Sequence, residues 1–433
     1  MNETRRSFLK QSVAATSTGL ILPDWLTDFA YGNTLRRKSN NDRLKLGSIG
    51  VGGRGSAIMR NALEFADLVA VCDVDQTRCE KARGETQAAT YEDYRALLER
   101  QAIDIITIGT PDHWHTKIAI DAMQAGKDVY CEKPMTLTIA EGQQLIKVVE
   151  ETGKIFQVGT QQRSEFNLLF LRAVATVRSG QLGKIEKVTV SLPLSTAEGG
   201  PFPPIAPPQG LNWEMWLGQA PLVDYCAERC HVRFRWWYEY SGGIVTDWGA
   251  HHLDIVHWAL GIENGGPLTI DGSETEMPEV EGGYNTPKSP IIKYSYPNDV
   301  QVEVVAGDEF IIFEGTSGRI RVNRDRISGK PIEDQDADQA TRDRVQSLMG
   351  ELYANGKPGN HMANFVESVR SRKQPISDVV SQHRSASACH LGNISCRLGR
   401  MLTWDAAREV FEGDDEANEM LQRTQRDPYT ISL

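Results

Sequence analysis

A glycine-rich segment near the start of the 433-residue chain limits the folds that the chain can adopt. Residues 50–55 read Gly-Val-Gly-Gly-Arg-Gly, which fits G-x-G-x-x-G; a short apolar run, Leu44–Ile49, precedes them, and a helix-compatible segment, Ser56–Glu64, follows. Between a strand and a helix, such glycines let the backbone approach a pyrophosphate, which binds to the N–H groups at the helix start. The pattern predicts the first strand, turn and helix of a doubly wound parallel sheet that binds a dinucleotide. The residues expected at the phosphates are Gly50, Gly52, Gly53, Arg54 and Gly55.

An acidic residue follows at the spacing that this fold uses for ribose binding. A second apolar run, Leu68–Cys72, ends on Asp73, 18 residues beyond Gly55. A carboxylate there accepts hydrogen bonds from the adenosine ribose hydroxyls, and its charge repels a 2′-phosphate. The sequence therefore predicts NAD rather than NADP as the cofactor. The alternative is a glycine-rich turn beside a solvated Asp73.

The alternation of strands and helices continues to about residue 160, which predicts a first domain over residues 44–160. Further strands are expected at Asp104–Gly109, Asp128–Cys131 and Ile155–Val158, and helices at His113–Gln124 and Ile139–Glu151. Two loops lie at the carboxyl ends of these strands, where ligands bind in such sheets. They supply the other expected cofactor contacts: Thr110, Pro111, His113, His115, Glu132 and Lys133. We expect the histidines to pack against the nicotinamide ribose rather than to act as acids.

The pattern changes after residue 160. Residues of later runs alternate between apolar and polar and are joined by short turns, which is typical of an antiparallel sheet with one solvated face. The expected strands are Ile185–Leu192, Ile291–Tyr296, Val300–Val305, Phe310–Phe313 and Arg319–Val322. Residues 161–433 are therefore expected to form a second, α+β domain, in a chain whose overall class is α/β.

The composition argues against several other kinds of protein. With a net charge of −11, the chain is poorly suited to bind polyanions, so we expect no nucleic-acid partner. No apolar run reaches the roughly 18–20 residues that a membrane span needs. The seven cysteines form no C-x-x-C motif, which argues against a disulfide framework or a zinc ribbon. A pairing of Cys226 with Cys230 in an oxidising compartment stays open.

The N-terminus carries the pattern of an export signal. Residues 4–10 read Thr-Arg-Arg-Ser-Phe-Leu-Lys and precede a weakly apolar stretch, Ser12–Leu22, which is typical of the twin-arginine route. We expect residues 1–40 to be a signal and linker, cleaved between Ala30 and Asn41, with the export machinery as a partner and the periplasm as the location. This route carries folded proteins, which suits a protein loaded with a cytoplasmic cofactor. The alternative is a basic tail.

Three segments together resemble one family. The glycine-rich loop, Glu132-Lys133-Pro134 and residues 242–251, Gly-Gly-Ile-Val-Thr-Asp-Trp-Gly-Ala-His, look like those of the glucose–fructose oxidoreductase/inositol dehydrogenase (Gfo/Idh/MocA) family. The resemblance extends from Leu44 to Trp404, and residues 157–163 and 383–400 resemble its exported bacterial branch. It implies a large open, mainly antiparallel second sheet that carries the substrate pocket and mediates assembly into a homodimer or homotetramer. It also implies that Lys133, Asp247 and His251 are the catalytic residues.

These three side chains suit the oxidation of an alcohol. We expect one helix from Gly242-Gly243 to about Leu260, on which Asp247 and His251 share a face. An imidazole can take a hydroxyl proton near neutral pH, and a carboxylate one turn away can orient it or raise its pKa. Lys133 would stabilise a developing alkoxide. The alternatives are an ordinary pair on a helix surface for Asp247 and His251, and a solvated side chain for Lys133.

The adjacent His251 and His252 do not suggest a metal site. Neighbouring side chains on a helix point about 100° apart, so both cannot easily bind one ion, and we expect no required metal. Residues 234–240, Phe-Arg-Trp-Trp-Tyr-Glu-Tyr, can form an aromatic platform for sugar rings, with core packing as the alternative. The expected substrate contacts are Gln161, Arg163, Trp237, Tyr238 and His252.

Three functions follow from these expectations. The first is an NAD-dependent oxidoreductase that acts on a hydroxyl of a sugar, polyol or glycoside. The second is a glycosidase that oxidises its substrate transiently with tightly held NAD, eliminates, adds water and returns the hydride. The third, a sugar-binding module without catalysis, is disfavoured because Lys133, Asp247 and His251 are present. Export keeps the glycosidase open, since no free NAD pool exists outside the cytoplasm.

Overall fold

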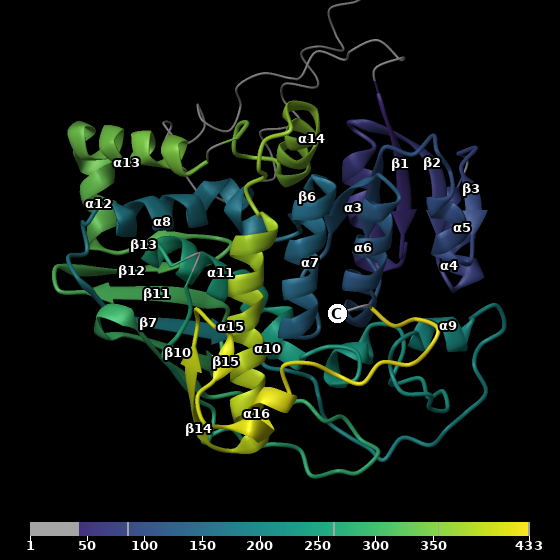
Figure 1. Cartoon of the computed structure of the whole chain (residues 1–433). Coiled ribbons are helices and arrows are strands. Elements are labelled where there is room, and N and C mark those ends of the chain that lie inside the picture. Colours follow the sequence, from purple (N-terminus) through teal and green to yellow (C-terminus); the bar gives the residue numbers. More distant parts are fainter. Residues whose placement is uncertain (1–42, 85, 263–264, 354, 432–433) are drawn as a thin grey trace, which may run out of the picture.

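The computed structural model describes residues 43–84, 86–262, 265–353 and 355–431. The export pattern and its expected cleavage region lie outside these residues. Figure 1 shows two sheets side by side, the first in purple and blue and the second in teal, green and yellow, each covered by helices. In the described part of the chain, no helix combines the length and apolar character that a bilayer span requires.

The first sheet has six strands, all parallel, in the order β3-β2-β1-β4-β5-β6. Its strands are β1 (Leu44–Ile49), β2 (Ala66–Cys72), β3 (Ala89–Tyr91), β4 (Ile105–Ile108), β5 (Asp128–Cys131) and β6 (Phe156–Val158). The predicted doubly wound domain is confirmed; the three-residue strand β3 was not expected. The strand order reverses between β1 and β4, and ligands bind in the crevice outside the carboxyl ends at such a point.

Helices cover both faces of this sheet, and their ends follow local sequence signals. They are α3 (Gly53–Ala62), α4 (Gln76–Arg83), α5 (Tyr94–Leu98), α6 (His115–Gln124) and α7 (Ile139–Thr152). The Thr138 hydroxyl accepts from the N–H of Glu141 at the start of α7, and Gly153, with φ +61°, ends that helix. A short 3-10 helix, η2 (Asp112–Trp114), precedes α6 and carries the loop that follows β4.

The second sheet has nine strands in the order β13-β12-β11-β7-β10-β9-β8-β14-β15. They are β7 (Ile185–Leu192), β8 (Thr269–Asp271), β9 (Ile292–Tyr296), β10 (Val300–Ala306), β11 (Phe310–Gly315), β12 (Gly318–Val322), β13 (Ile327–Ser328), β14 (Met401–Asp405) and β15 (Val410–Phe411). Only β7 and β10 pair in parallel, so the prediction of a mainly antiparallel sheet is confirmed. In β10, Val300, Val302 and Val304 are buried and the residues between them are not.

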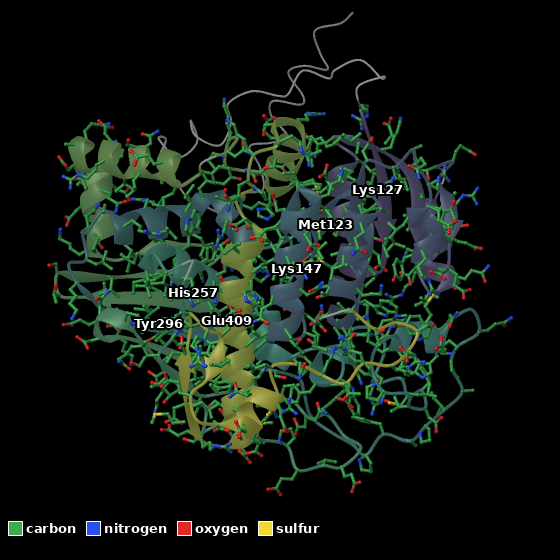
Figure 2. The ribbon with its side chains drawn as sticks, viewed as in Figure 1. Met123, Lys127, Lys147, His257, Tyr296 and Glu409 are labelled. Carbon is green, nitrogen blue, oxygen red and sulfur yellow. The ribbon has the colours of Figure 1, made fainter. Side chains whose placement is uncertain are left out.

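One face of this sheet is covered by α8 (Leu169–Arg178), α11 (Gly249–Leu260) and α15 (Val379–Leu398), whose apolar side chains share a core with the strands. The His257 ring on α11 lies 2.8 Å from the Tyr296 hydroxyl on β9, and Figure 2 shows the two side by side. A helix is thereby fixed to the sheet by a buried polar contact as well as by packing.

Later parts of the chain also contribute to the first domain. Phe365, on α14 (His361–Ser371), packs with Tyr130 of β5, and Tyr429 packs against Trp114. Helix α15 lies between α7 and α11 (Figure 1). Phe365 and Tyr429 thus complete the core of the first domain, and α15 links its helix α7 to α11 of the second domain.

Candidate active site

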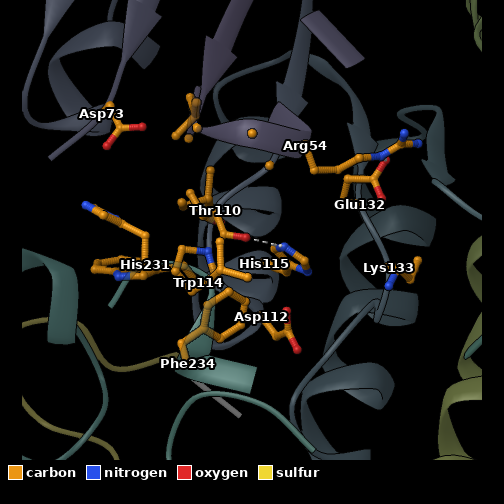
Figure 3. A pocket seen from close by; sticks show the side chains of 18 of the residues that line it. Arg54, Asp73, Thr110, Asp112, Trp114, His115, Glu132, Lys133, His231 and Phe234 are labelled. Carbon is orange, nitrogen blue, oxygen red and sulfur yellow. Dashed lines mark hydrogen bonds and ion pairs between the residues drawn. The ribbon is translucent and has the colours of Figure 1, made fainter. Parts of the chain in front are cut away.

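A cavity of about 390 Å³ lies at the carboxyl ends of the parallel strands and is lined by both domains. The first domain contributes the glycine-rich loop, Asp73, and the loops after β4 and β5, as Figure 3 shows in part. The second contributes Phe234, Arg235, Trp248, His251 and Arg324. The volume falls in the range of about 300–1,000 Å³ that small-molecule sites occupy.

The glycine-rich loop passes too close to other backbone for side chains. Gly50 has φ +73°, and a Cβ there would lie 2.5 Å from the Thr110 nitrogen. A Cβ on Gly55 would lie 1.7 Å from the Gly50 oxygen, so Gly55 packs behind the loop, and it does not line the cavity. Gly53, by contrast, has nothing within 4 Å of its Cβ position. The start of α3 is therefore open on the cavity side and fits a pyrophosphate.

Asp73 is held at the position that the sequence predicts for a ribose ligand. Its Oδ2 accepts from the Val51 nitrogen at 2.8 Å, and its Oδ1 accepts from the Asp75 nitrogen at 3.0 Å. Burial raises the pKa of this carboxyl, and the two backbone donors oppose that shift. Arg78 and His231 line the same end of the cavity.

The loop after β4 presents an unsatisfied polar atom to the cavity. Thr110 lines the cavity, and its hydroxyl is buried with no partner in the described structure, so a ligand would supply one. His115 also lines the cavity; its Nδ1 lies 2.7 Å from the Pro134 oxygen and its Nε2 lies 3.0 Å from the Thr110 oxygen. The histidine thus ties the loops after β4 and β5 together. Along with the open helix start, this site fits a dinucleotide.

His113 is placed differently from the prediction. Its Nε2 lies 2.9 Å from the Trp216 oxygen, and the ring packs among Trp114, Trp216 and Tyr240. Burial lowers its pKa to about 3, so it stays neutral. His113 supports the cavity wall from behind and is not one of the residues that line it.

Lys133 and Asp247 meet across the domain boundary. The Lys133 ammonium donates to the Asp247 carboxylate and to its backbone carbonyl, each at 2.6 Å, and Arg235 Nε donates to the same carboxylate at 3.2 Å. Burial alone would raise the pKa of Asp247, but the two cations hold it at about 2. Asp247 is therefore held as a carboxylate, and its oxygens fix the position of the Lys133 ammonium.

His251 lines the cavity near this group. Burial, followed by the nearby charges of Lys133 and Arg324, lowers its pKa well below the usual value, and its Nδ1 has no partner in the described structure. The imidazole is therefore neutral, and its Nδ1 is available to a ligand that enters the cavity or to water.

Two expectations about this segment are wrong. The predicted single helix is divided into α10 (Gly243–Asp247) and α11, with Trp248 between them. The Asp247 carboxylate turns to Lys133 and Arg235 instead of to His251, and the pKa of His251 is lowered rather than raised. Asp247 thus pairs with cations from other segments, although His251 lies only four residues away in the sequence.

Gln161 is the predicted substrate contact that does line the cavity. Its Nε2 donates to Glu132 Oε1 at 3.0 Å and to the Tyr130 hydroxyl at 2.9 Å. Arg54, from the glycine-rich loop, donates to the same Glu132 oxygen at 2.9 Å. Glu132 thus joins the glycine-rich loop to the segment after β5 that carries Lys133.

The other predicted substrate contacts do not reach this cavity. Arg163 is buried in a bidentate ion pair with Asp254, 2.8 Å and 2.5 Å long. His252 is fully buried beside Phe170 and Trp248. Trp237 packs under the Arg229 guanidinium, and Tyr238 lines a second cavity. Arg163, His252 and Trp237 are therefore buried in the core and are not available to a ligand in this cavity.

Several lining residues were not predicted. Asp112 lies in a loop that the sequence singled out, and Arg235 lies in the aromatic segment, so both had a signal. Arg324 follows β12, outside any motif, and its guanidinium lies over the rings of Trp248, at 4.3 Å, and Phe166, at 4.7 Å. Its position depends on the second sheet meeting the first domain, which local sequence does not reveal.

The two cysteines whose pairing the sequence left open, Cys226 and Cys230, are free thiols in the structure.

Comparison with known proteins identifies the family. A model of an oxidoreductase family with an NAD-binding Rossmann fold matches residues 44–160, and the model of the same family's C-terminal alpha/beta domain matches residues 199–431. The chain belongs to the Gfo/Idh/MocA oxidoreductase family. The cofactor of this Gfo/Idh/MocA protein is NAD, in agreement with the glycine-rich loop and Asp73.

Relatives of this Gfo/Idh/MocA protein include both hydrolases and dehydrogenases. A glycosyl hydrolase family 109 protein of Shewanella putrefaciens is 35% identical over 177 residues, covering 35% of this chain and 38% of the relative. An inositol 2-dehydrogenase of Salmonella typhimurium is 31% identical over 147 residues, covering 33% of this chain and 43% of the relative. The matches thus span less than half the length of these curated relatives.

A solved structure extends the likeness to both domains. The WlbA dehydrogenase from Bordetella pertussis, in complex with NADH and UDP-GlcNAcA, superposes with a TM-score of 0.62 at 18% identity, covering 84% of this chain and 99% of that one. At this identity the likeness shows that the fold is shared.

Proposed function

We propose that this protein is an NAD-dependent oxidoreductase that acts on a hydroxyl of a sugar, polyol or glycoside. The observation that carries the proposal is that one cavity is lined by the glycine-rich loop and Asp73, by Lys133, which is bonded to Asp247, and by a neutral His251. The inositol dehydrogenase relative supports this class of substrate.

In this proposal, Lys133 supplies positive charge and His251 forms a hydrogen bond with the substrate hydroxyl. The Lys133 ammonium has three donors, of which two are used on Asp247, so one remains for a substrate oxygen. Its charge stabilises the alkoxide character that develops as the hydroxyl is oxidised. His251 can orient the same hydroxyl through a neutral ring nitrogen. When bound, the nicotinamide supplies the acceptor for the hydrogen that leaves carbon.

The test is the purified protein, assayed first for bound NAD and then mixed with a panel of sugars, polyols and glycosides. We expect at least one compound to give a ketosugar together with reduced nicotinamide, which is read from its absorbance. A protein that binds NAD but reduces it with no compound of the panel would contradict the proposal.

The family 109 relatives favour a second candidate, a glycosidase that uses NAD transiently. It would oxidise a ring hydroxyl, eliminate the glycosidic substituent after loss of an acidified C–H proton, add water and return the hydride. The same panel separates the two, because the glycosidase releases free sugar without net NAD reduction. It would also exchange the acidified hydrogen with deuterium from solvent.

We further propose that the chain is exported to the periplasm by the twin-arginine machinery and assembles as a homodimer or homotetramer through the second sheet. The arginine pair of residues 5–6 supports the first proposal, and the extended nine-stranded sheet, with helices on one face, supports the second. Light scattering of the purified protein would measure the assembly, and a monomer would contradict it.

A further inference from the structure

Arg324 is a cavity residue to which the proposed function gives no role. It lies in the turn between β12 and β13, and the side chain of Asn323 fixes that turn. The Asn323 Oδ1 accepts from the backbone N–H groups of Asp325 and Arg326, at 3.0 Å and 2.9 Å. Contacts of this kind hold the backbone of a turn in one conformation. The second sheet therefore presents Arg324 to the cavity from a fixed point.

Two aromatic rings of the cavity wall hold the guanidinium in place. Its central carbon lies 4.3 Å from the ring centre of Trp248 and 4.7 Å from that of Phe166. A guanidinium over an aromatic face is attracted by the electron density of the ring. These contacts stabilise the cation but use none of its N–H donors, so a ligand that accepts hydrogen bonds can still bind to it.

The guanidinium of Arg324 lacks a hydrogen-bonded carboxylate. Its Nε lies 3.4 Å from Glu309 Oε1, yet neither atom has a hydrogen-bond partner among the described residues. No described residue accepts a hydrogen bond from either Nη atom, and only 28% of the side chain is exposed. Burial lowers the pKa of Arg324, and the charge of Glu309 opposes that shift only in part. The cation is therefore largely withdrawn from water without a full set of partners, a state that a bound anion would stabilise.

The other cations at this end of the cavity each donate to a carboxylate at 3.2 Å or less. The pairs are Arg54 with Glu132, and Lys133 and Arg235 with Asp247. Glu165 lines the cavity as well, but it accepts from the His361 N–H at 3.3 Å and forms no ion pair with Arg324. Arg324 thus differs from the other cations in that all its N–H groups remain available.

Arg324 lies near the residues that we assign to the reacting hydroxyl. The Trp248 ring that it contacts also contacts His251, with 6.2 Å between the ring centres. Burial, followed by the charges of Lys133 and Arg324, lowers the pKa of His251, so both cations lie near that imidazole. A sugar whose hydroxyl meets Lys133 can therefore direct another substituent toward Arg324. The planar fork of a guanidinium matches a carboxylate, which can accept two parallel hydrogen bonds from it.

We propose that Arg324 is a substrate-binding residue and that the substrate is an acidic sugar or glycoside, whose carboxylate binds to this guanidinium. The inference rests on the proposed function, which places the reacting hydroxyl at Lys133. A carboxylate gives Arg324 the hydrogen-bonded anion that the described residues do not supply. A neutral hydroxymethyl group at the same place accepts only a weaker hydrogen bond. Arg324 therefore determines the specificity for a uronic acid over its neutral counterpart.

The first test compares sugars that differ only in this charge. Methyl glucuronide, methyl galacturonide and methyl mannuronide are each paired with the methyl glycoside of the neutral sugar, and binding to the NAD-loaded protein is measured by calorimetry. In at least one pair, the acid should bind about 10–100-fold more tightly, as for a hydrogen bond to a charged group. Its affinity should fall as salt is added, while that of the neutral glycoside should not. Equal, weaker or absent binding of the acid in every pair would overturn the proposal.

Substitution of Arg324 should remove this preference. Arg324→Gln stays polar but loses the charge, so the acid should bind about as weakly as its neutral counterpart, whose own affinity should barely change. Arg324→Lys keeps the charge without the planar fork and should retain part of the preference. Arg326→Gln, at an exposed position in the same turn, is the matched control and should behave as wild type. A folded Arg324→Gln protein that keeps the wild-type preference would overturn the proposal. If its melting temperature shows that Arg324→Gln is unfolded, Arg324→Lys and the salt dependence of wild type decide.

These binding measurements do not depend on turnover. If the acid binds through Arg324 but no compound reduces the NAD, the proposed function fails and the assignment of Arg324 stands. If neutral sugars alone bind and are oxidised, the proposed function stands and the assignment of Arg324 fails.

Discussion

Lys133 and Asp247 join the two domains at the floor of the cavity, where one ammonium group donates to both the carboxylate and the backbone carbonyl of the same residue, each at 2.6 Å. The two side chains are 14% and 18% exposed, so the pair is shielded from water but still open to the cavity. If the Lys133 contact is lost, the largely buried Asp247 carboxylate keeps only Arg235 as a cationic partner. We therefore expect the pair to hold the two domains together as well as to act in catalysis.

Removal of the cation should separate these roles. In Lys133→Met, Asp247 keeps Arg235 as a partner, so the pKa of Asp247 should rise from its low value while the domains stay folded. Loss of the charge that faces the developing alkoxide should reduce turnover by about 10²–10³-fold, as for removal of one oxyanion donor. Single-turnover reduction of bound NAD measures this effect.

Lys147→Met is the matched control for this substitution. Lys147 lies on the exposed face of α7, with 65% of its side chain exposed and a 3.9 Å contact to Glu151 (Figure 2). It should keep wild-type turnover, because surface ion pairs contribute little to stability. Equal rates for Lys133→Met and wild type would show that Lys133 has only a structural role.

His251 should contribute to the chemical step and not to cofactor binding. It lines the cavity and lies close enough to Lys133 for that charge to lower its pKa, whereas we expect the adenosine end near Asp73. His251→Ala is therefore expected to reduce turnover by roughly 10²–10⁴-fold. NAD affinity, measured by fluorescence titration, should barely change. His252→Ala tests the neighbouring position, where loss of core packing should lower the melting temperature more than the turnover. A variant of His251 with near-normal turnover would remove it from the catalytic set.

The sequence predicted the parts of this site that depend on local backbone. The glycine-rich loop needs φ +73° at Gly50 and close contact at Gly55, and glycine spacing reports such requirements directly. The strands β4 and β5 carry buried runs that indicate a central parallel sheet. Lys133, which follows β5 directly after Glu132, could be placed for the same reason.

What the sequence could not show are contacts between distant segments. The bidentate pair of Arg163 with Asp254 joins residues 91 positions apart, so a cation that was expected at the substrate lies in the core. The break at Trp248 is likewise not marked by a proline, since residues 243–260 contain none. Arg324 likewise reaches the cavity only because the second sheet folds against the first domain.

Asp73 should determine the choice between the two nicotinamide cofactors. Its carboxylate is fixed by the Val51 and Asp75 N–H groups at the ribose end of the cavity, where a 2′-phosphate would meet its negative charge. Asp73→Ser removes that charge and keeps a small polar group. The ratio of dissociation constants for NADP⁺ and NAD⁺ should fall by about tenfold or more, which corresponds to roughly 1.4 kcal/mol. Wild-type protein that binds both cofactors equally would contradict the assignment.

The arginine pair at positions 5 and 6 should control export. Replacing both with lysine keeps the charge but removes the guanidinium pair that defines a twin-arginine signal. We expect the precursor to accumulate in the cytoplasm, measured by fractionation and immunoblotting. A single change of Lys10 to Arg, which leaves the pair intact, is the control. Unaltered export of the double variant would show that another route is used.

Glu409 should make the packing of the two domains sensitive to acid. Its carboxylate accepts from Gln143 of α7 at 2.7 Å, contacts the His383 ring of α15 at 2.7 Å and pairs with Arg384. Burial alone would raise the pKa of Glu409, but these partners lower it to about 2. The folded state therefore holds the proton more weakly than the unfolded state does. The stability that this carboxylate contributes is present above about pH 4.5 and is lost as the pH falls toward 2.

Glu409→Gln should remove this contribution while keeping the size of the side chain. We expect the free energy of unfolding at pH 7, measured by urea denaturation, to fall by about 2–3 kcal/mol, as for loss of one partner in a buried charged group. The difference between variant and wild type should shrink as the pH is lowered from 5 toward 2, because wild type then loses the same charge. Glu419→Gln, at an exposed position on α16 (Asp415–Glu419), should change neither value. A difference that stays constant with pH would mean that Glu409 stabilises the domain packing by its shape and not by its charge.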